Sequence, residues 1–493
     1  MRLSGTNSAL ADVVSDLLAV PVHADRFKES AAIRALDERL SGLVYKLAAE
    51  ERFEGKLGQT LALHTHGKLG AQRLLLVGMG KSGATELAEL RHAAATGVRA
   101  ASAAGARCYA YALPEGAADD ASAQLAAEGV LLGAYRFDRY LSGDAKRPET
   151  VVEVLFVGAD SAPSAAALAR AEIIAGAVAQ ARSMINEPAA EMTPSKMADV
   201  AREVAAKHGL AIVVLDREGC HKLGMGMFLA VSQGSIEEPR FIHLTYTPKA
   251  KATRRVCLIG KGVTFDSGGL SLKPSASMED MKIDMSGAAA VIAAIGAIAA
   301  IGSDVEVHAI AACTENMPSG SAYKLGDVLR SMAGKTVEIN NTDAEGRLTL
   351  GDAITYARRL EPDEIFDFAT LTGAIVVALG PYTAGVMSNT PALSDRWLAA
   401  AKAAGEEMWP MPLVDRLKEQ LKSDIADMKN TGERYGGAIT AGLFLREFAG
   451  ETPWVHVDLA GPASATKQQG ATGKGGTGFA VATMVEYLAP RRG

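Results

Sequence analysis

The chain has 493 residues, which is more than one hydrophobic core usually supports, so we expect at least two domains. Its composition, 48% apolar and 22% charged with 50 glycines, is that of a globular α/β protein and excludes a disordered or fibrous chain. The formal net charge of −6 argues against a globally basic nucleic-acid-binding protein and favours small or neutral partners.

The N-terminal segment and the cysteines indicate the compartment. Asp12 and Asp16 interrupt the apolar residues near the N-terminus, so we expect no export signal. No two cysteines form a CxxC pair, which argues against a disulfide framework or a thiolate zinc site. The four are Cys108, Cys220, Cys257 and Cys313. We therefore expect a reducing, cytoplasmic location.

The first part of the chain alternates apolar runs with helical patterns, which predicts an α/β domain. The expected strands are 73–80, 108–113 and 151–158, and the expected helices lie near 85–103 and 121–137.

Two glycine-rich segments resemble phosphate-binding loops. Gly78 to Gly83 match GxGxxG, but the next strand lacks an acid at its end, and its only acid, Glu115, lies beyond the turn. We therefore expect a tight turn between strand and helix rather than a dinucleotide site. Segment 470–479 is expected to be a loop, because no strand leads into it.

An Ala-rich helical pattern from about 162 to 184 separates the two parts, and Thr193 with the neighbouring prolines starts a new helix. We place the N-terminal domain at 1–165, a connecting helix at 166–190 and the larger C-terminal domain at 191–493.

The second part repeats the alternation with longer apolar runs, which predicts a mixed, mostly parallel sheet covered by helices on both faces. The expected strands are 211–216, 241–247, 255–262, 305–315, 336–343, 364–373 and 454–461. The uncharged stretch 285–303 is long enough for a membrane span, but it consists mainly of Ala and Gly. We interpret it as a buried core helix, so no membrane partner is expected.

Acidic residues and lysines gather where these strands end or helices begin. Lys261, Asp266 and Lys273 follow one strand, and Asp284 precedes the uncharged helix. Asp343 and Glu345 are two apart, so they would point to one side if the segment is extended. Acids from three segments cannot all ionise in one pocket without positive charge, and divalent metals supply it. Oxygen ligands without His or Cys suit Mg, Mn or a carboxylate-rich zinc site of a two-metal hydrolase.

At NTDAEGRL (341–348) the sequence closely resembles the leucyl (cytosolic) aminopeptidase family of bacterial type, whose signature is this octapeptide. The resemblance continues through 261–274, 281–291, 367–374, 430–445 and 454–463, and so covers nearly everything from about 185 onward. The N-terminal part is only generally similar. The resemblance implies two α/β domains, each a mixed, mostly parallel sheet flanked by helices. The first would be macro-like and the second of the dinuclear-metal aminopeptidase type.

The same resemblance implies two divalent metal ions per subunit, Mn or Zn, with Mg or Co possible at the exchangeable site. Asp266 and Glu345 would bridge the ions, Asp343 would complete the exchangeable site, and Lys261 with Asp284 would complete the tighter one. Lys261 can ligate a metal only as the neutral amine, and lowering its pKa from about 10.4 to below 7 costs about 5 kcal/mol. Burial and two dications can supply that.

Catalytic and substrate-binding roles also follow from the resemblance. Lys273 would stabilise the oxyanion, and Arg347 would hold a bicarbonate ion acting as general base, since a guanidinium stays protonated. The implied substrate-binding residues are Lys273, Met281, Asn341, Thr370, Leu371 and Gly373. A metal-bridging hydroxide would attack the scissile carbonyl, releasing leucine and other N-terminal amino acids from peptides. The family is typically a homohexamer.

Two alternatives stay open at this point. Some bacterial members of the family bind DNA as regulators, so an additional or sole DNA-binding role is possible, although the net charge disfavours it. A dipeptidase restricted to substrates such as cysteinylglycine is the other alternative, and a dipeptide panel would separate it from a broad enzyme.

Overall fold

The computed structural model describes residues 1–83, 86–115, 119–146, 150–158 and 161–490. These form two compact units: unit 1 comprises 1–176 and 467–473, and unit 2 comprises 177–466 and 474–493. The division falls inside helix α5 (Ala165–Asn186), within the helical pattern that the sequence places at about 162 to 184. Each unit contains a mixed, mostly parallel sheet flanked by helices, which confirms the predicted fold class.

Unit 1 has a six-stranded sheet in which every pairing is parallel except that of the edge strand β3 with β4. Its strands form because the segments are apolar on both faces; β2, for example, is buried at seven of its eight positions. In sheet order the strands are β1 (Arg2–Thr6), β6 (Glu153–Val157), β5 (Cys108–Ala112), β2 (Ser15–Val22), β4 (Ala71–Gly78) and β3 (Thr60–His64).

Helices cover both faces of this sheet. Leu18 and Val20 of β2 pack against α1 and α2 on one face, whereas Leu17 and Ala19 of the same strand pack against α3 and α4 on the other. From β2 the chain runs through α1 and α2 to the edge pair β3 and β4 on one side of β2, and from β4 it crosses through α3 to β5 on the other side. The described helices are η1 (Leu10–Asp12), α1 (Ala31–Arg39), α2 (Leu43–Glu50), α3 (Glu86–Ala103), α4 (Asp120–Ala134) and η2 (Gly143–Ala145).

Unit 2 has an eight-stranded sheet whose central strands β17, β13, β9 and β10 run parallel. Strands β8 and β7 continue it antiparallel on one side, and β14 pairs antiparallel with β17 on the other. In sheet order the strands are β15 (Met408–Pro410), β14 (Ala384–Ser388), β17 (Trp454–Asp458), β13 (Glu364–Ala369), β9 (Arg255–Asp266), β10 (Glu306–Asn316), β8 (Arg240–Tyr246) and β7 (Ala211–Leu215).

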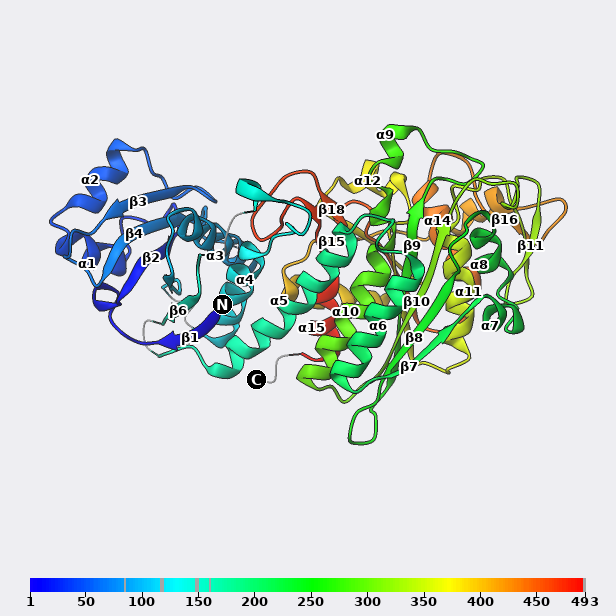
Figure 1. The fold of residues 1–493 in the computed structure, drawn as a ribbon, viewed down its shortest axis with the longest axis horizontal. Helices are drawn as coiled ribbons and strands as arrows, with labels where there is room; N and C mark the ends of the chain where they lie inside the picture. Colours follow the sequence, from blue (N-terminus) through cyan, green and yellow to red (C-terminus); the bar gives the residue numbers. More distant parts are fainter. Residues whose placement is uncertain (84–85, 116–118, 147–149, 159–160, 491–493) are drawn as a thin grey trace. The chain divides into compact units, whose positions relative to one another are not determined.

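Two helical layers enclose this sheet (Figure 1). Helices α8, α11 and α14 share one apolar core with the sheet, and α6, α10, α13 and α15 pack on the opposite side. The helices are α6 (Pro194–His208), α7 (Arg217–Lys222), α8 (Gly226–Val231), η3 (Ser232–Gly234), α9 (Ser275–Met278), η4 (Met281–Met285), α10 (Ser286–Ile301), α11 (Gly346–Arg358), α12 (Gly373–Leu379), α13 (Pro391–Ala404), η5 (Asp415–Leu421), α14 (Gly437–Ala449) and α15 (Val481–Leu488).

The uncharged stretch is α10, and it is buried all round from Ser286 to Ile298. Ser275–Ile301 is long and apolar enough to cross a membrane by composition alone, but 83% of its most apolar window lies inside the fold. The prediction of a core helix is confirmed.

One expected strand lies elsewhere. Segment 336–343 was expected in the main sheet, but only Thr336–Glu338 (β12) is extended, and it pairs with β11 (Val328–Arg330) and β16 (Met428–Lys429) in a separate small sheet. That expectation was wrong because residues 341–344 turn into α11. A further two-stranded sheet joins β18 (Ser464–Ala465) and β19 (Gly475–Gly476).

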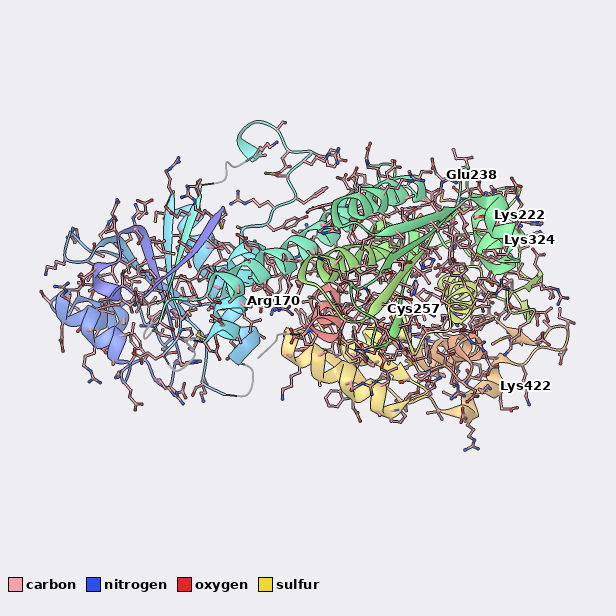
Figure 2. All side chains as sticks on the ribbon, turned by 90° about the horizontal axis from the view of Figure 1, so that it is seen from below. Arg170, Lys222, Glu238, Cys257, Lys324 and Lys422 are labelled. Atoms are coloured by element: carbon pink, nitrogen blue, oxygen red, sulfur yellow. The ribbon has the colours of Figure 1, made fainter. Side chains whose placement is uncertain are left out.

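All four cysteines are unpaired, as the absence of a CxxC pair suggested. Cys220, Cys257 and Cys313 are buried. Figure 2 shows Cys257 among the strands of unit 2, whereas Lys222, Lys324 and Lys422 lie at its periphery. The buried thiols therefore act as small apolar core groups.

A buried pair of histidines joins β8 to β10. His243 Nε2 lies 2.9 Å from His308 Nδ1, and His243 Nδ1 lies 3.0 Å from the hydroxyl of Tyr356. His308 Nε2 lies 3.0 Å from Glu306 Oε1. Burial and then the neighbouring His308 lower the pKa of His243 from 6.5 to about 4. The folded protein therefore holds His243 neutral.

This histidine predicts an acid-sensitive term in the stability of unit 2. Between pH 6.5 and 4 the unfolded chain binds a proton that folded His243 does not, so stability falls as pH drops through this window. We expect the free energy of unfolding, measured with urea, to fall less between pH 7.0 and pH 4.5 in His243→Gln than in the natural protein. The difference should be up to about 3 kcal/mol. Equal losses in both proteins would contradict the assignment.

Candidate active site

Five predicted ligand residues come together at the carboxyl end of β9. Lys261 and Asp266 lie on that strand, and Asp284 lies in η4 directly before α10. Asp343 and Glu345 lie in the turn into α11 and not on an extended segment, because Glu345 already has helical backbone angles as its N-cap. One carboxylate oxygen from each of Asp266, Asp343 and Glu345 lies within 4.8 Å of the others.

Two lysines are interleaved with these carboxylates. The Nζ atom of Lys261 lies 2.7 Å from Asp284 Oδ2 and 2.8 Å from Glu345 Oε1. Lys273 Nζ lies 2.9 Å from Asp266 Oδ2 and also contacts Asp343 Oδ1. The side chain of Lys261 is 4% exposed and that of Lys273 is 15% exposed, so only Lys273 is open to a substrate.

Burial and mutual repulsion make the carboxylates difficult to ionise. Burial raises the pKa of Asp284 well above its usual range. Burial and then the charge of Asp266 raise the pKa of Asp343 to about 6. Glu345 differs, because its two lysine neighbours outweigh burial and lower its pKa. Four acids against two lysines leave a site that demands more positive charge.

The charge state of Lys261 depends on what else neutralises the acids. Burial alone would lower the pKa of its ammonium, but Asp284 and Glu345 outweigh burial and raise it. The ammonium of Lys261 thus takes the place of a cation between these two carboxylates. The pKa of Lys261 would fall, as a metal-ligating amine requires, only if divalent cations neutralised these carboxylates instead.

The donor set fits divalent cations. Asp284 Oδ2 and Asp343 Oδ1 are buried and, among the described residues, contact lysine ammonium groups without an aligned hydrogen bond. Carboxylate oxygens in such a position, beside an amine that can lose its proton, are suitable ligands for Mn, Mg or Zn.

Asn316 and the paired glycines hold Asp266 in place. Asn316 Nδ2 donates to Asp266 Oδ1 at 2.9 Å, and the Gly268 N–H donates to the same oxygen at 2.9 Å. A bulge at Thr314/Glu315 brings Asn316 into register with Asp266. Gly268 has a φ of +85°, which permits the sharp turn after the strand. Sequence reasoning missed Asn316, although a polar residue ending a buried strand was a usable signal.

Gly346 permits the approach of Lys261. A Cβ atom at this position would lie 2.5 Å from Cε of Lys261, so a larger residue would displace the lysine. This glycine belongs to the octapeptide at 341–348, and the structure gives a steric reason for it.

Arg347 is buried beside the cluster. Its Nη1 donates to the Asn430 carbonyl at 2.9 Å, and its Nε has no hydrogen-bond partner among the described residues. Burial lowers the pKa of Arg347 to about 10, so it remains charged at neutral pH. Asn430, which sequence reasoning missed, also donates from Nδ2 to the Asn341 carbonyl at 2.6 Å.

The predicted substrate-binding residues border this cluster. Thr370 donates its hydroxyl to Asp284 Oδ1 at 2.7 Å, and its carbonyl accepts from Lys261 Nζ at 3.1 Å. Leu371 follows Thr370, and Gly373 begins α12. Two more flank the acids: Met281 begins η4, and Asn341 accepts the Asp343 N–H at 2.8 Å.

Asp458, at the end of β17, anchors the loop that follows Thr370. Its Oδ1 accepts from the Leu371 N–H at 3.1 Å, and its Oδ2 accepts from the Thr372 hydroxyl at 2.7 Å. Thr372 also caps α12. Sequence reasoning missed Asp458, because a buried acid ending a strand carries no mark that distinguishes an anchor from a ligand.

Comparisons with known proteins match this chain along its length. The model of the cytosol aminopeptidase family, catalytic domain, matches residues 179–485, and that of the N-terminal domain of the same family matches residues 19–144. Probable cytosol aminopeptidases of Trichormus variabilis and Nostoc punctiforme are 43% and 44% identical to it over 490 residues, with 99% of each chain covered.

Solved structures agree with these matches. A mutant of tomato leucine aminopeptidase superimposes with a TM-score of 0.91 at 36% identity, covering 100% of this chain and 97% of that one. The bottromycin maturation enzyme BotP in complex with Mn has a TM-score of 0.84 at 38% identity, covering 96% and 98%.

The Asp458 anchor predicts a matched pair of variants. Thr372→Val removes the hydroxyl that Asp458 accepts, whereas Thr372→Ser keeps it. Loss of a hydrogen bond to a buried charge and of a helix cap should destabilise the valine variant by about 2 kcal/mol. Because the loop positions Thr370 against Asp284, Mn²⁺ binding measured by calorimetry should weaken in the valine variant and recover in the serine variant. Unchanged Mn²⁺ affinity in Thr372→Val would limit Asp458 to a structural role.

Proposed function

Because the chain belongs to the cytosol aminopeptidase family, we propose that it releases leucine and other N-terminal amino acids from peptides with two divalent metal ions held at the carboxylate cluster. Family membership makes it an aminopeptidase that acts on peptides. The observation that supports the metal site is the convergence of Asp266, Asp343 and Glu345 within 4.8 Å in a site with an excess of acids.

The proposed ligands divide into two sets. Asp266 and Glu345, whose oxygens come within 4.8 Å of each other and of one from Asp343, would serve both ions. Asp343, the most exposed of the acids, would complete the more exchangeable site. Lys261 and Asp284, which are paired with each other and buried, would complete the tighter one. Two such ions would make a water molecule more acidic and polarise the scissile carbonyl.

Several metals fit this donor set. Mn or Zn is the first choice, and Mg or Co can serve at the exchangeable site. A solved relative at 38% identity was studied in complex with Mn, which supports Mn here.

Lys273 is suited to stabilise negative charge on the substrate. Burial lowers its pKa, but Asp266 and its neighbours outweigh that and raise it, so Nζ stays protonated at neutral pH. Its ammonium is partly open and lies at the acid cluster, where it can donate to the oxygen of a carbonyl under attack.

Arg347 is suited to hold a small anion. Its buried guanidinium has an unpartnered Nε among the described residues and cannot itself accept a proton. We assign it a bicarbonate ion that would take a proton as general base. The backbone carbonyl of Asn430 accepts a hydrogen bond from Nη1 of the same guanidinium and so holds it in place.

The walls of the site select the end of a peptide. The excess of acids attracts a free α-amino group electrostatically. Met281, Asn341, Thr370, Leu371 and Gly373 would contact the substrate around Lys273.

The oligomeric state and the cellular location are inferred from the family. We infer a cytoplasmic homohexamer from the family. No observation on the described residues favours the DNA-binding alternative, and the net charge of −6 disfavours it. A dipeptide panel that includes cysteinylglycine would distinguish the restricted dipeptidase from the broad aminopeptidase.

The decisive test is hydrolysis of leucine p-nitroanilide by metal-stripped protein, with and without added Mn²⁺ or Zn²⁺. We expect activity only with metal, and a loss of at least about 100-fold in Asp343→Ala and in Lys273→Ala, the size expected for removing a ligand or an oxyanion donor.

The matched controls are Asp424→Ala and Lys251→Ala, which remove an exposed acid and an exposed lysine elsewhere in unit 2. Both should retain full activity. Metal-independent hydrolysis, or no hydrolysis with any metal or peptide, would refute the proposal.

A further inference from the structure

A crevice in unit 1 lies where open α/β sheets usually bind ligands. The chain leaves β2 for β4 on one side and reaches β5 on the other, so the neighbouring strands β2 and β5 form the point where the strand order reverses. Their connections pass to opposite faces of the sheet, and this opens a space beyond their carboxyl ends.

About 80 Å³ of the crevice can be occupied by the centre of a water molecule, which is room for roughly six waters and so for a ligand the size of an amino acid. Its base is apolar and is formed by both strand ends and the residues beside them. The apolar lining residues are Leu10, Val20, Pro21, Val22, Ala112, Leu113 and Pro114.

The rim carries polar groups of both charges. Arg26 follows β2 and is exposed, and its guanidinium has no ion pair or hydrogen bond with any other described residue. The Nδ1 atom of His23 is buried without a partner among the described residues. Glu115 follows β5, and its Oε1 accepts from the Ala32 N–H at 2.6 Å and from the Ser30 hydroxyl at 3.3 Å.

Glu115 is therefore held in position, yet only one of its oxygens is used. The two donors, at the start of α1, fix Oε1 of this lining residue, and Oε2 forms no hydrogen bond with any other described residue. A fixed acid and a free guanidinium on one rim call for a ligand that carries both a cation and an anion.

We propose that this crevice binds a free α-amino acid with an apolar side chain. Glu115 accepts a hydrogen bond from the ammonium group, and Arg26 donates to the carboxylate. The side chain lies against Val20 and Leu113. A phosphate-bearing ligand fits less well, because its charge would meet Glu115.

The site itself lies outside the carboxylate cluster and does not depend on the aminopeptidase reaction. Only the source of the ligand rests on the proposed function, since release of N-terminal residues would produce apolar amino acids such as leucine. An enzyme whose product binds a second site can respond to the product concentration.

Equilibrium dialysis of the full chain with radiolabelled leucine, in the presence of a chelator, tests the proposal. We expect saturable binding that is at least tenfold weaker in Arg26→Gln and in Glu115→Gln. The glutamine at 115 keeps an oxygen for the start of α1, so the fold should persist; circular dichroism checks this. Arg34→Gln and Glu38→Gln, which change exposed residues of α1 outside the crevice, should bind as the natural protein does.

A variant of the catalytic site distinguishes leucine binding in this crevice from leucine binding at the carboxylate cluster. Leucine binding should survive in Asp343→Ala, whereas loss there with retention in Glu115→Gln would assign the leucine to the catalytic site and overturn the proposal. Leucinamide and 4-methylpentanoate, which lack the carboxylate and the ammonium, should each compete poorly. Absence of leucine binding, or displacement of the bound leucine by adenosine monophosphate, would also overturn it. Inactivity on peptides would leave these binding results unaffected.

Discussion

The ion pairs of Lys261 with Asp284 and Glu345 are the constraint on which the rest of unit 2 depends. A buried ammonium between two buried carboxylates is tolerated only if each partner is held at contact distance, because any one of them left alone would be a desolvated charge. These partners come from three segments, namely β9, η4 and the start of α11. The sheet, the helix α10 and the turn into α11 must therefore be placed together for the cluster to exist.

Small residues make that placement possible. Gly346 leaves room for the stem of Lys261, and the left-handed Gly268 turns the chain after Asp266. Around them, neutral groups such as Asn316 and the Thr370 hydroxyl each satisfy one carboxylate oxygen while adding no charge. The cluster thus keeps its charge imbalance, and that imbalance is what a cation can use.

Much of the fold and of the acid cluster could be predicted from the sequence, because the signals for them are local. The apolar runs gave the central strands, the uncharged Ala-rich segment gave α10, and the octapeptide with its acids identified the cluster. The segment 336–343 was assigned to the wrong sheet, because β-propensity does not say with which strand a segment pairs. Asn316, Asn430 and Asp458 were missed because their roles depend on register and on bonds between residues far apart in the chain. Single polar residues at strand ends are ordinary until the fold brings them together.

The assignment of 467–473 to unit 1 has a consequence for how the protein is made. This short piece follows nearly all of unit 2 in the chain. During synthesis, residues 1–176 therefore leave the ribosome long before the last piece of unit 1 does. Domains usually fold as units during synthesis, N-terminal first. Here the first unit cannot be completed before the second has been almost wholly translated. An isolated 1–176 fragment would likewise lack part of its native packing, and its behaviour would not represent that unit in the intact protein.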